Sequence, residues 1–514
     1  MQKRHTNSSG RRLAVAVGIA MLLFPGAATA GGSNESRGFR KAVTLAGVRS
    51  HQQALQTIAS ANGDTRASGT EGYDASVEYV VDRLEDAGYA PVVQPFEFPF
   101  FRELSPSELE RVSPDARTYV NGTDFATMTY SGSDDVTASA TFVDTDASPS
   151  ATSTSGCEEA DFAGFPAGNI AIMQRGTCTF FVKAQNAQSA GATAAIIFNR
   201  GTAGSTGPVA GTLGSPGITI PTIGASYAVG TEQYALRDSG LTMRVRTDTE
   251  SDIRTTWNVI AETASGDPDN VVVAGAHLDS VIAGPGINDN GSGSATILEI
   301  AEVFAAQERV ARNKVRFIWF GAEELGLLGS RYYVNDLTTD ERDDIMAMLN
   351  FDMVGSPNYV RFVYDGDGSH SAPAGPAGSA FIEDVFVDYF NDQGLASEPT
   401  QFSGRSDYGP FIAVGIPAGG LFTGAEGVKT ASQAAIYGGT AGIAYDPCYH
   451  QACDTFANNS AAGLDEMSDA AAHAVLFMSR TKVDITVESA TQPVRSSTKA
   501  IRPDFQPHED DATR

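Results

Sequence analysis

Residues 271–294, VVVAGAHLDSVIAGPGINDNGSGS, join an apolar run to a polar loop. The β-branched run ends abruptly at His277 and Asp279, and a Gly/Pro-rich loop then delivers a second carboxylate, Asp289. Runs of this kind are typical of strands that a parallel sheet buries on both faces. In α/β proteins, ligands bind at the carboxyl ends of such strands. The stretch therefore predicts a parallel sheet with half of a metal site at the end of one strand.

Two further strand-like runs and one late loop supply the other half of this site. Residues 315–320, VRFIWF, are followed by Glu323 and Glu324. A third run ends at Asp352, and His450 follows a loop late in the chain. Imidazole nitrogen and carboxylate oxygen are ligands that Zn²⁺ accepts. We therefore expect a zinc site that needs no cysteine.

The chain alternates strands, loops and helices from residue 255 onward. We expect, in order, a strand that ends at residue 276, a helix over 292–307, a strand over 315–320, a helix over 326–334 and a strand over 347–353. Upstream, the spacing of apolar residues predicts helices over 43–61 and 73–87, and alternation predicts a strand over 92–101. This order predicts an α/β fold in three layers, with a mostly parallel mixed sheet covered by helices on both faces.

Six motifs in this part of the chain resemble the secreted bacterial aminopeptidases with two co-catalytic zinc ions, the leucine aminopeptidase type of peptidase clan MH. The motifs are HLDS, NDNGSG, FGAEELGLLGS, NFDMVG, GRSDYGP and CYHQACDTF, in this order over residues 250–480. Residues 62–89 resemble the first loop and helix of the same domain. The resemblance implies the zinc exopeptidase fold and hydrolysis of the N-terminal peptide bond of peptides and proteins, with a preference for apolar first residues such as Leu.

The resemblance also implies a set of metal ligands. His277 and Asp352 hold one zinc ion, Glu324 and His450 hold the other, and Asp289 bridges both. A bridging carboxylate suits this plan because its two oxygens can join metals about 3.5–4 Å apart. Two zinc ions per chain are therefore expected, and calcium stays open as a modulator.

The residues expected to act on the substrate also follow from the resemblance. Glu323 is implied as the general base, which takes the proton of the attacking water and passes it to the leaving amine. Asp279 is implied to accept the imidazole N–H of His277 and fix its tautomer. Tyr449 is implied to donate a hydrogen bond to the oxyanion. The implied substrate-binding residues are Arg405 and Phe422.

The four cysteines are Cys157, Cys178, Cys448 and Cys453. They permit three pairings, and their spacing favours two local disulfides, Cys157 with Cys178 and Cys448 with Cys453. The second disulfide brackets Tyr449 and would stiffen the loop that carries it. Disulfides are typical of exported proteins.

The first thirty residues are typical of a signal peptide. They begin with basic residues, continue with an apolar run too short to cross a bilayer, and end in a small-residue cleavage site. The general and the twin-arginine export routes both stay open. The formal net charge of −27 argues against nucleic-acid binding, which depends on a basic surface. We expect a secreted, extracellular monomer without stable membrane association.

Residues 157–199 resemble the protease-associated (PA) domain, a small β-rich module found in many secreted peptidases. They contain no cluster of histidines or paired acids that would support catalysis. The expected segments are a signal peptide (1–30), a flexible spacer (31–42), the zinc peptidase domain in two parts (43–129 and 249–483), the inserted PA domain (130–248) and a polar C-terminal tail (484–514).

Two other interpretations stay open at this point. A carboxypeptidase or a glutaminyl cyclase has the same fold, and some receptor ectodomains combine this fold with a PA domain and bind partners without catalysis. The complete set of five ligands and Glu323 favours the metallo-aminopeptidase over both.

Overall fold

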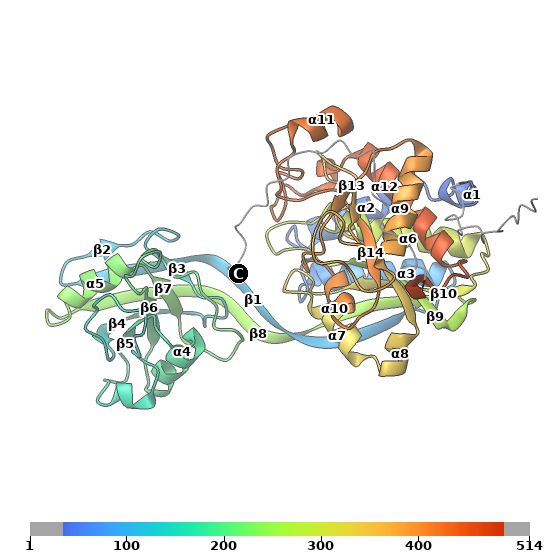
Figure 1. Ribbon diagram of the computed structural model, residues 1–514. Coiled ribbons are helices and arrows are strands. Elements are labelled where there is room, and N and C mark those ends of the chain that lie inside the picture. The colour runs from blue at the N-terminus through green and yellow to red at the C-terminus, as the bar shows by residue number, and fades with distance from the viewer. Residues whose placement is uncertain (1–33, 488–514) are drawn as a thin grey trace, which may run out of the picture.

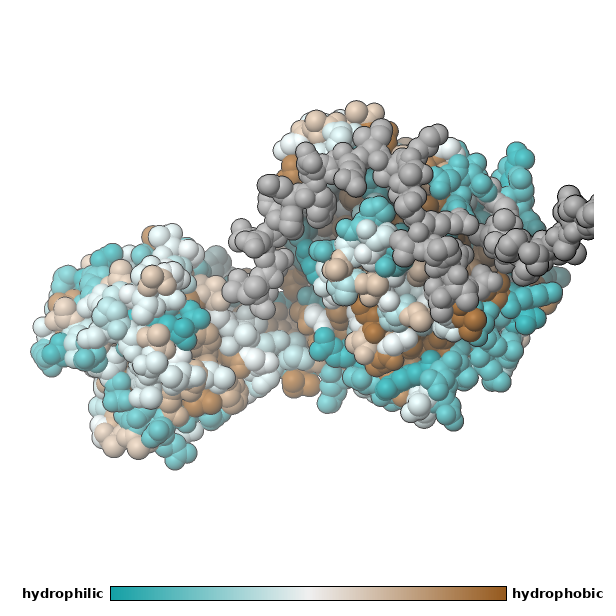
Figure 2. Space-filling model, in the orientation of Figure 1, coloured by the Kyte–Doolittle hydropathy of each residue, from teal (hydrophilic) through white to brown (hydrophobic). Residues whose placement is uncertain are grey.

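The computed structural model describes residues 34–487 and shows two lobes joined by two long strands (Figure 1). The expected signal peptide and most of the expected C-terminal tail lie outside these residues. Strands β1 (Val92–Ser113) and β8 (Thr242–Glu262) are antiparallel neighbours along most of their length and run from one lobe into the other. A space-filling view shows the narrow waist that they form between the lobes (Figure 2).

The larger lobe is built on a mixed sheet with the strand order β13-β12-β14-β11-β9-β10-β8. Strands β10, β9, β11 and β14 are parallel to one another, whereas β8 joins β10 and β12 joins β14 in antiparallel orientation. The strands are β9 (Asp267–His277), β10 (Asn313–Phe320), β11 (Ile345–Phe351), β12 (Phe362–Tyr364), β13 (Glu398–Thr400) and β14 (Ala418–Phe422).

Helices cover both faces of this sheet, as the side chains of β9 show. Val272 and Ala274 lie in one apolar core with residues of several helices, whereas Val271 and Val273 lie in a second core on the opposite face. The helices of the first face are α2 (Leu45–Ala61), α3 (Glu71–Asp86), α6 (Gly291–Ala306), α9 (Ser379–Gln393) and α12 (Ala461–Met478). Those of the second face are α7 (Leu328–Asp336) and α10 (Tyr408–Ala413). The predicted three-layer α/β fold is confirmed.

The smaller lobe lies between β1 and β8 in sequence and has its own apolar cores, which lie within residues 109–245. Its elements are β2 (Arg117–Thr118), β3 (Phe125–Thr127), β4 (Asp134–Phe142), β5 (Ile170–Gln174), α4 (Phe180–Ser189), β6 (Ala194–Phe198), β7 (Thr222–Ala225) and α5 (Tyr227–Ala235). The predicted disulfide between Cys157 and Cys178 is present, with an S–S distance of 2.05 Å. This lobe is therefore the β-rich module expected from the sequence.

Part of the expected flexible spacer packs on the larger lobe instead. The short helix α1 (Arg37–Arg40) contains Phe39, which is fully buried and meets Phe304 edge to face at 5.8 Å. Nearby, Ser36 Oγ lies 2.8 Å from Nδ1 of His473 on α12. One buried aromatic in a polar stretch gives no periodic signal, which is why the sequence pattern did not indicate this docking.

The buried His473, which contacts Ser36, should make the stability of the protein depend on pH. Burial, helped by the charge of Arg40, lowers the pKa of His473 to about 4. Between pH 6.5 and 4 the unfolded chain therefore binds a proton that the folded chain does not, so the free energy of unfolding falls as the pH falls, by up to about 3 kcal/mol. Urea unfolding at pH 7 and 4.5 checks this, with His473→Phe as the comparison. An unchanged pH dependence in that variant would contradict the assignment.

Within residues 34–487, no helix combines the length and the apolar character needed to cross a membrane. Two shorter helices complete the larger lobe: α8 (Thr339–Asp343) before β11, and α11 (Ala431–Tyr437), which projects at the top of Figure 1.

Candidate active site

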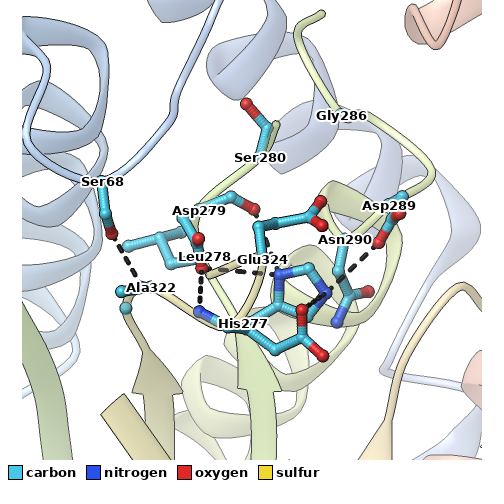
Figure 3. Close-up of polar contacts among 12 residues, drawn as sticks. Ser68, His277, Leu278, Asp279, Ser280, Gly286, Asp289, Asn290, Ala322 and Glu324 are labelled. Atoms are coloured by element: carbon cyan, nitrogen blue, oxygen red, sulfur yellow. Dashed lines mark hydrogen bonds and ion pairs between the residues drawn. The ribbon is translucent and has the colours of Figure 1, made fainter. Parts of the chain in front are cut away.

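Neighbouring parallel strands bring the predicted site residues together at one edge of the sheet. His277 is the last residue of β9, and Asp352 directly follows β11. Glu323 and Glu324 lie just beyond the end of β10. Asp289 comes from the loop that precedes α6. Figure 3 shows His277, Asp289 and Glu324 gathered around one space.

Asp289 lies between two histidines and offers one oxygen to each. Its Oδ1 is 3.2 Å from Nε2 of His277, and its Oδ2 is 3.3 Å from Nε2 of His450. Oδ1 of Asp352 lies 3.3 Å from the same nitrogen of His277. Oε2 of Glu324 lies 3.0 Å from that of His450. The five residues thus form two groups, each with one histidine and one carboxylate of its own, that share Asp289.

The donor atoms of this cluster suit divalent metal ions. Oδ2 of Asp289, Oε1 of Glu324 and Oδ1 of Asp352 are buried and have no hydrogen-bond partner. Buried carboxylate oxygens without hydrogen bonds are costly unless a cation compensates them. Imidazole nitrogen and carboxylate oxygen are a zinc donor set. The residues present therefore fit the metal site expected from the sequence.

The electrostatics of the cluster agree with this fit. Burial and the neighbouring carboxylate of Asp289 raise the pKa of Glu324 to about 7. Burial also raises the pKa of Glu323 well above its usual value, and the charge of Asp407 adds to this although His277 opposes it. Burial alone would lower the pKa of His277, but the surrounding carboxylates hold it well above its usual value. The buried carboxyl groups of the cluster thus outnumber the positive charges that the histidines can supply.

Asp279 uses its main chain and its side chain for different contacts. Nδ1 of His277 lies 3.2 Å from the backbone oxygen of Asp279 but 3.6 Å from its carboxylate. An N–H at Nδ1 that donates to this oxygen leaves Nε2 free to bind a metal. The carboxylate instead accepts a hydrogen bond of 3.2 Å from the backbone N–H of Glu323. The distances thus favour the main-chain oxygen, and not the predicted carboxylate, as the acceptor for His277.

A short disulfide-closed loop carries Tyr449 and His450. Cys448 and Cys453 are bonded as predicted, with an S–S distance of 2.07 Å. The rings of Tyr449 and His450 stack with their centroids 3.8 Å apart. Burial, together with nearby carboxylates, raises the pKa of Tyr449 above its usual value, so its hydroxyl keeps its proton. The loop therefore presents a hydrogen-bond donor beside the cluster.

The two predicted substrate-binding residues lie in different surroundings. Arg405 is half exposed, pairs with Glu426 at 2.6 Å, and donates a hydrogen bond of 3.2 Å to the hydroxyl of Tyr449. Phe422 ends β14, and its ring stacks on Phe362 with centroids 6.0 Å apart. Arg405 is therefore joined to the site through its hydrogen bond to Tyr449, whereas the substrate contact of Phe422 stays a prediction.

Three residues that support the site did not emerge from the sequence. Arg66 is fully buried and donates to the backbone oxygens of Leu278, Pro285 and Gly286, which holds both ends of the loop before Asp289. The carboxylate of Asp454 accepts from the backbone N–H groups of Asn288 and Asp289 at 2.8 and 2.9 Å. Ser406 donates to Oδ2 of Asp352 at 2.6 Å. All three lie inside segments that carried the resemblance, but Arg66 and Asp454 bind main-chain atoms, which residue spacing does not indicate.

Comparison with known proteins gives the family. Residues 258–475 match the model of peptidase family M28, and residues 137–232 match that of the PA domain. An aminopeptidase of Pseudomonas aeruginosa is 47% identical over 463 residues, which cover 89% of this chain and 86% of that protein. A probable leucine aminopeptidase 2 of Aspergillus fumigatus is 40% identical over 447 residues, 87% and 85% of the two chains.

Among solved structures, a zinc aminopeptidase from Bacillus subtilis is similar to this chain. It is 25% identical, with a TM-score of 0.55, over 84% of this chain and 94% of that chain. The match covers most of both chains, so it includes parts of both lobes. The chain therefore belongs to peptidase family M28, as a metallo-aminopeptidase that carries a PA domain.

Proposed function

We propose that this protein is a secreted zinc aminopeptidase that removes apolar N-terminal residues such as Leu from peptides and proteins. The observation that carries the proposal is Asp289, which offers one oxygen to His277 and the other to His450. The zinc aminopeptidase of Bacillus subtilis supports the choice of metal. The probable leucine aminopeptidase 2 of Aspergillus fumigatus supports the choice of substrate.

Two zinc ions would be held by this cluster. His277, Asp352 and Asp289 would hold one ion, and His450, Glu324 and Asp289 the other. Bound zinc lowers the pKa of a water ligand to about 7 and polarises a carbonyl oxygen. Calcium as a modulator, the monomeric state and the domain boundaries stay predictions.

The protein's own side chains would carry the proton transfers. Glu323 would take the proton of the attacking water and pass it to the leaving nitrogen, while the carboxylate of Asp279 holds its backbone in place. The hydroxyl of Tyr449 accepts a hydrogen bond from Arg405, so its own proton is free to be donated to the oxyanion. Arg405 would thereby orient the donor.

Secretion is supported by the two formed disulfides, which persist in oxidising compartments. The segment expected as a signal peptide lies outside the residues that the structure describes. Mass measurement of the protein recovered from culture medium, with its new N-terminus near residue 31, would test this part of the proposal.

Hydrolysis of a panel of aminoacyl p-nitroanilides, with and without a chelator, tests the function. We expect chelator-sensitive release from Leu, no release from N-blocked Leu, and about two zinc ions per chain. Cleavage restricted to C-terminal substrates, or cyclisation of N-terminal glutamine, would replace the aminopeptidase by another enzyme of this fold. Absence of both metal and turnover would favour a binding protein.

A further inference from the structure

A pocket of about 100 Å³ opens beside the carboxylate cluster, on the side of the waist between the lobes. Its apolar walls are Ala67, Phe100, Phe101, Ile282 and Leu325. These residues come from the loop before α3, from β1, and from the loops that follow β9 and β10. Glu324 of the cluster lines the same pocket, so the pocket borders the cluster.

The mouth of this pocket exposes large apolar side chains. Ile282 is 40% exposed and Leu325 is 45% exposed, although both lie close to buried carboxylates. Phe101 is half buried, and its ring contacts that of Tyr130 in the smaller lobe at 5.9 Å. Exposed apolar side chains that gather around a concave site with a few polar groups indicate ligand binding.

The strand order and the predicted substrate contact of Phe422 together give the direction in which a bound peptide would run. The cluster lies at the ends of β11, β9 and β10, in the middle of the series β14-β11-β9-β10-β8. Phe422 ends β14 on one side, and the pocket lies by β10 and by β1, the partner of β8, on the other. An extended peptide whose first side chain lies toward β14 therefore places its following residues at the pocket.

We propose that this pocket binds the apolar side chain of the substrate's second residue, the residue that follows the scissile bond. The inference rests on the aminopeptidase function proposed above. An apolar cavity of about 150 Å³ holds a benzene molecule, so this pocket has room for one side chain such as Val or Leu. Because β1 continues into the smaller lobe, the strand that carries the PA domain also takes part in selecting substrates.

The ratio of kcat/KM for Leu-Leu-Gly to that for Leu-Gly-Gly measures this selection. We expect the wild type to prefer Leu-Leu-Gly by about tenfold, since apolar pocket contacts discriminate by that order. Ile282→Ser and Phe101→Ser should each lower the ratio to about threefold or less. Ile253→Ser is the matched control, because Ile253 is 54% exposed on β8 but does not line the pocket, and it should keep the wild-type ratio.

Each result bears on a different part of the argument. A wild type that cleaves both peptides equally, in a chelator-sensitive reaction, overturns the pocket and leaves the aminopeptidase intact. A wild-type ratio retained in Ile282→Ser also overturns the pocket, and this variant does not disturb the contact between Phe101 and Tyr130. Failure to cleave either peptide overturns the proposed function and this inference with it.

Discussion

Glu323→Gln is expected to lower kcat for Leu-p-nitroanilide by about 10²- to 10⁴-fold, the usual contribution of a general base. The amide keeps the size of the side chain but cannot accept the proton of the attacking water. Glu323 is not one of the five metal ligands proposed here, so zinc content should stay at about two per chain. Steady-state kinetics and metal analysis of the same sample measure both quantities.

The exposed acid Glu97 on β1 offers a matched control. Glu97→Gln makes the same chemical change at an exposed strand position outside the cluster and should retain wild-type kinetics. If Glu323→Gln kept its activity within about tenfold of the wild type, the base would have to be another residue.

Asp289→Ala is expected to remove both zinc ions and to lower activity further than Glu323→Gln. Without Asp289 each group keeps only one histidine and one carboxylate, whereas catalytic zinc sites have three protein ligands. Asp352→Ala removes a ligand from only one group. We therefore expect zinc to fall well below one ion per chain in the first variant and to stay near one in the second.

Metal analysis after gel filtration into zinc-free buffer distinguishes these outcomes. Equal zinc content in Asp289→Ala and Asp352→Ala would show that Asp289 does not serve both ions. Circular dichroism of both proteins, compared with the wild type, separates loss of metal from loss of fold.

The sequence predicts the middle of the central sheet well because β9, β10 and β11 each have two signals. Val271, Val272 and Val273 indicate a strand buried on both faces, and the polar residues that follow mark its carboxyl end. The residues that follow these strands are then expected to lie close together, because parallel strands present their carboxyl ends at one edge of the sheet. The cluster of His277, Asp289 and Asp352 at that edge agrees with this reasoning.

The sequence does not predict contacts to main-chain atoms, and it does not predict strands whose apolar residues fail to alternate regularly. Arg66 and Asp454 hold backbone atoms of the loop around Asp289, and no pattern of side chains reveals a backbone acceptor. The strand expected over 92–101 is present but continues to Ser113 as part of β1. Its second half is rich in charged residues, and ion pairs such as Glu108 with Arg244 at 2.7 Å hold it to β8.

The interrupted order of the larger lobe has a consequence for how the chain acquires activity. Helices α2 and α3 are made before the smaller lobe, but the helices α6 and α12 in the same core are made after it. At about 5–20 residues per second, the early helices wait tens of seconds for their partners. The smaller lobe has complete cores within residues 109–245 and can fold during that wait. Because His450 and Asp454 follow all the other site residues in the sequence, the nascent chain stays inactive as a peptidase until residue 454 has been made.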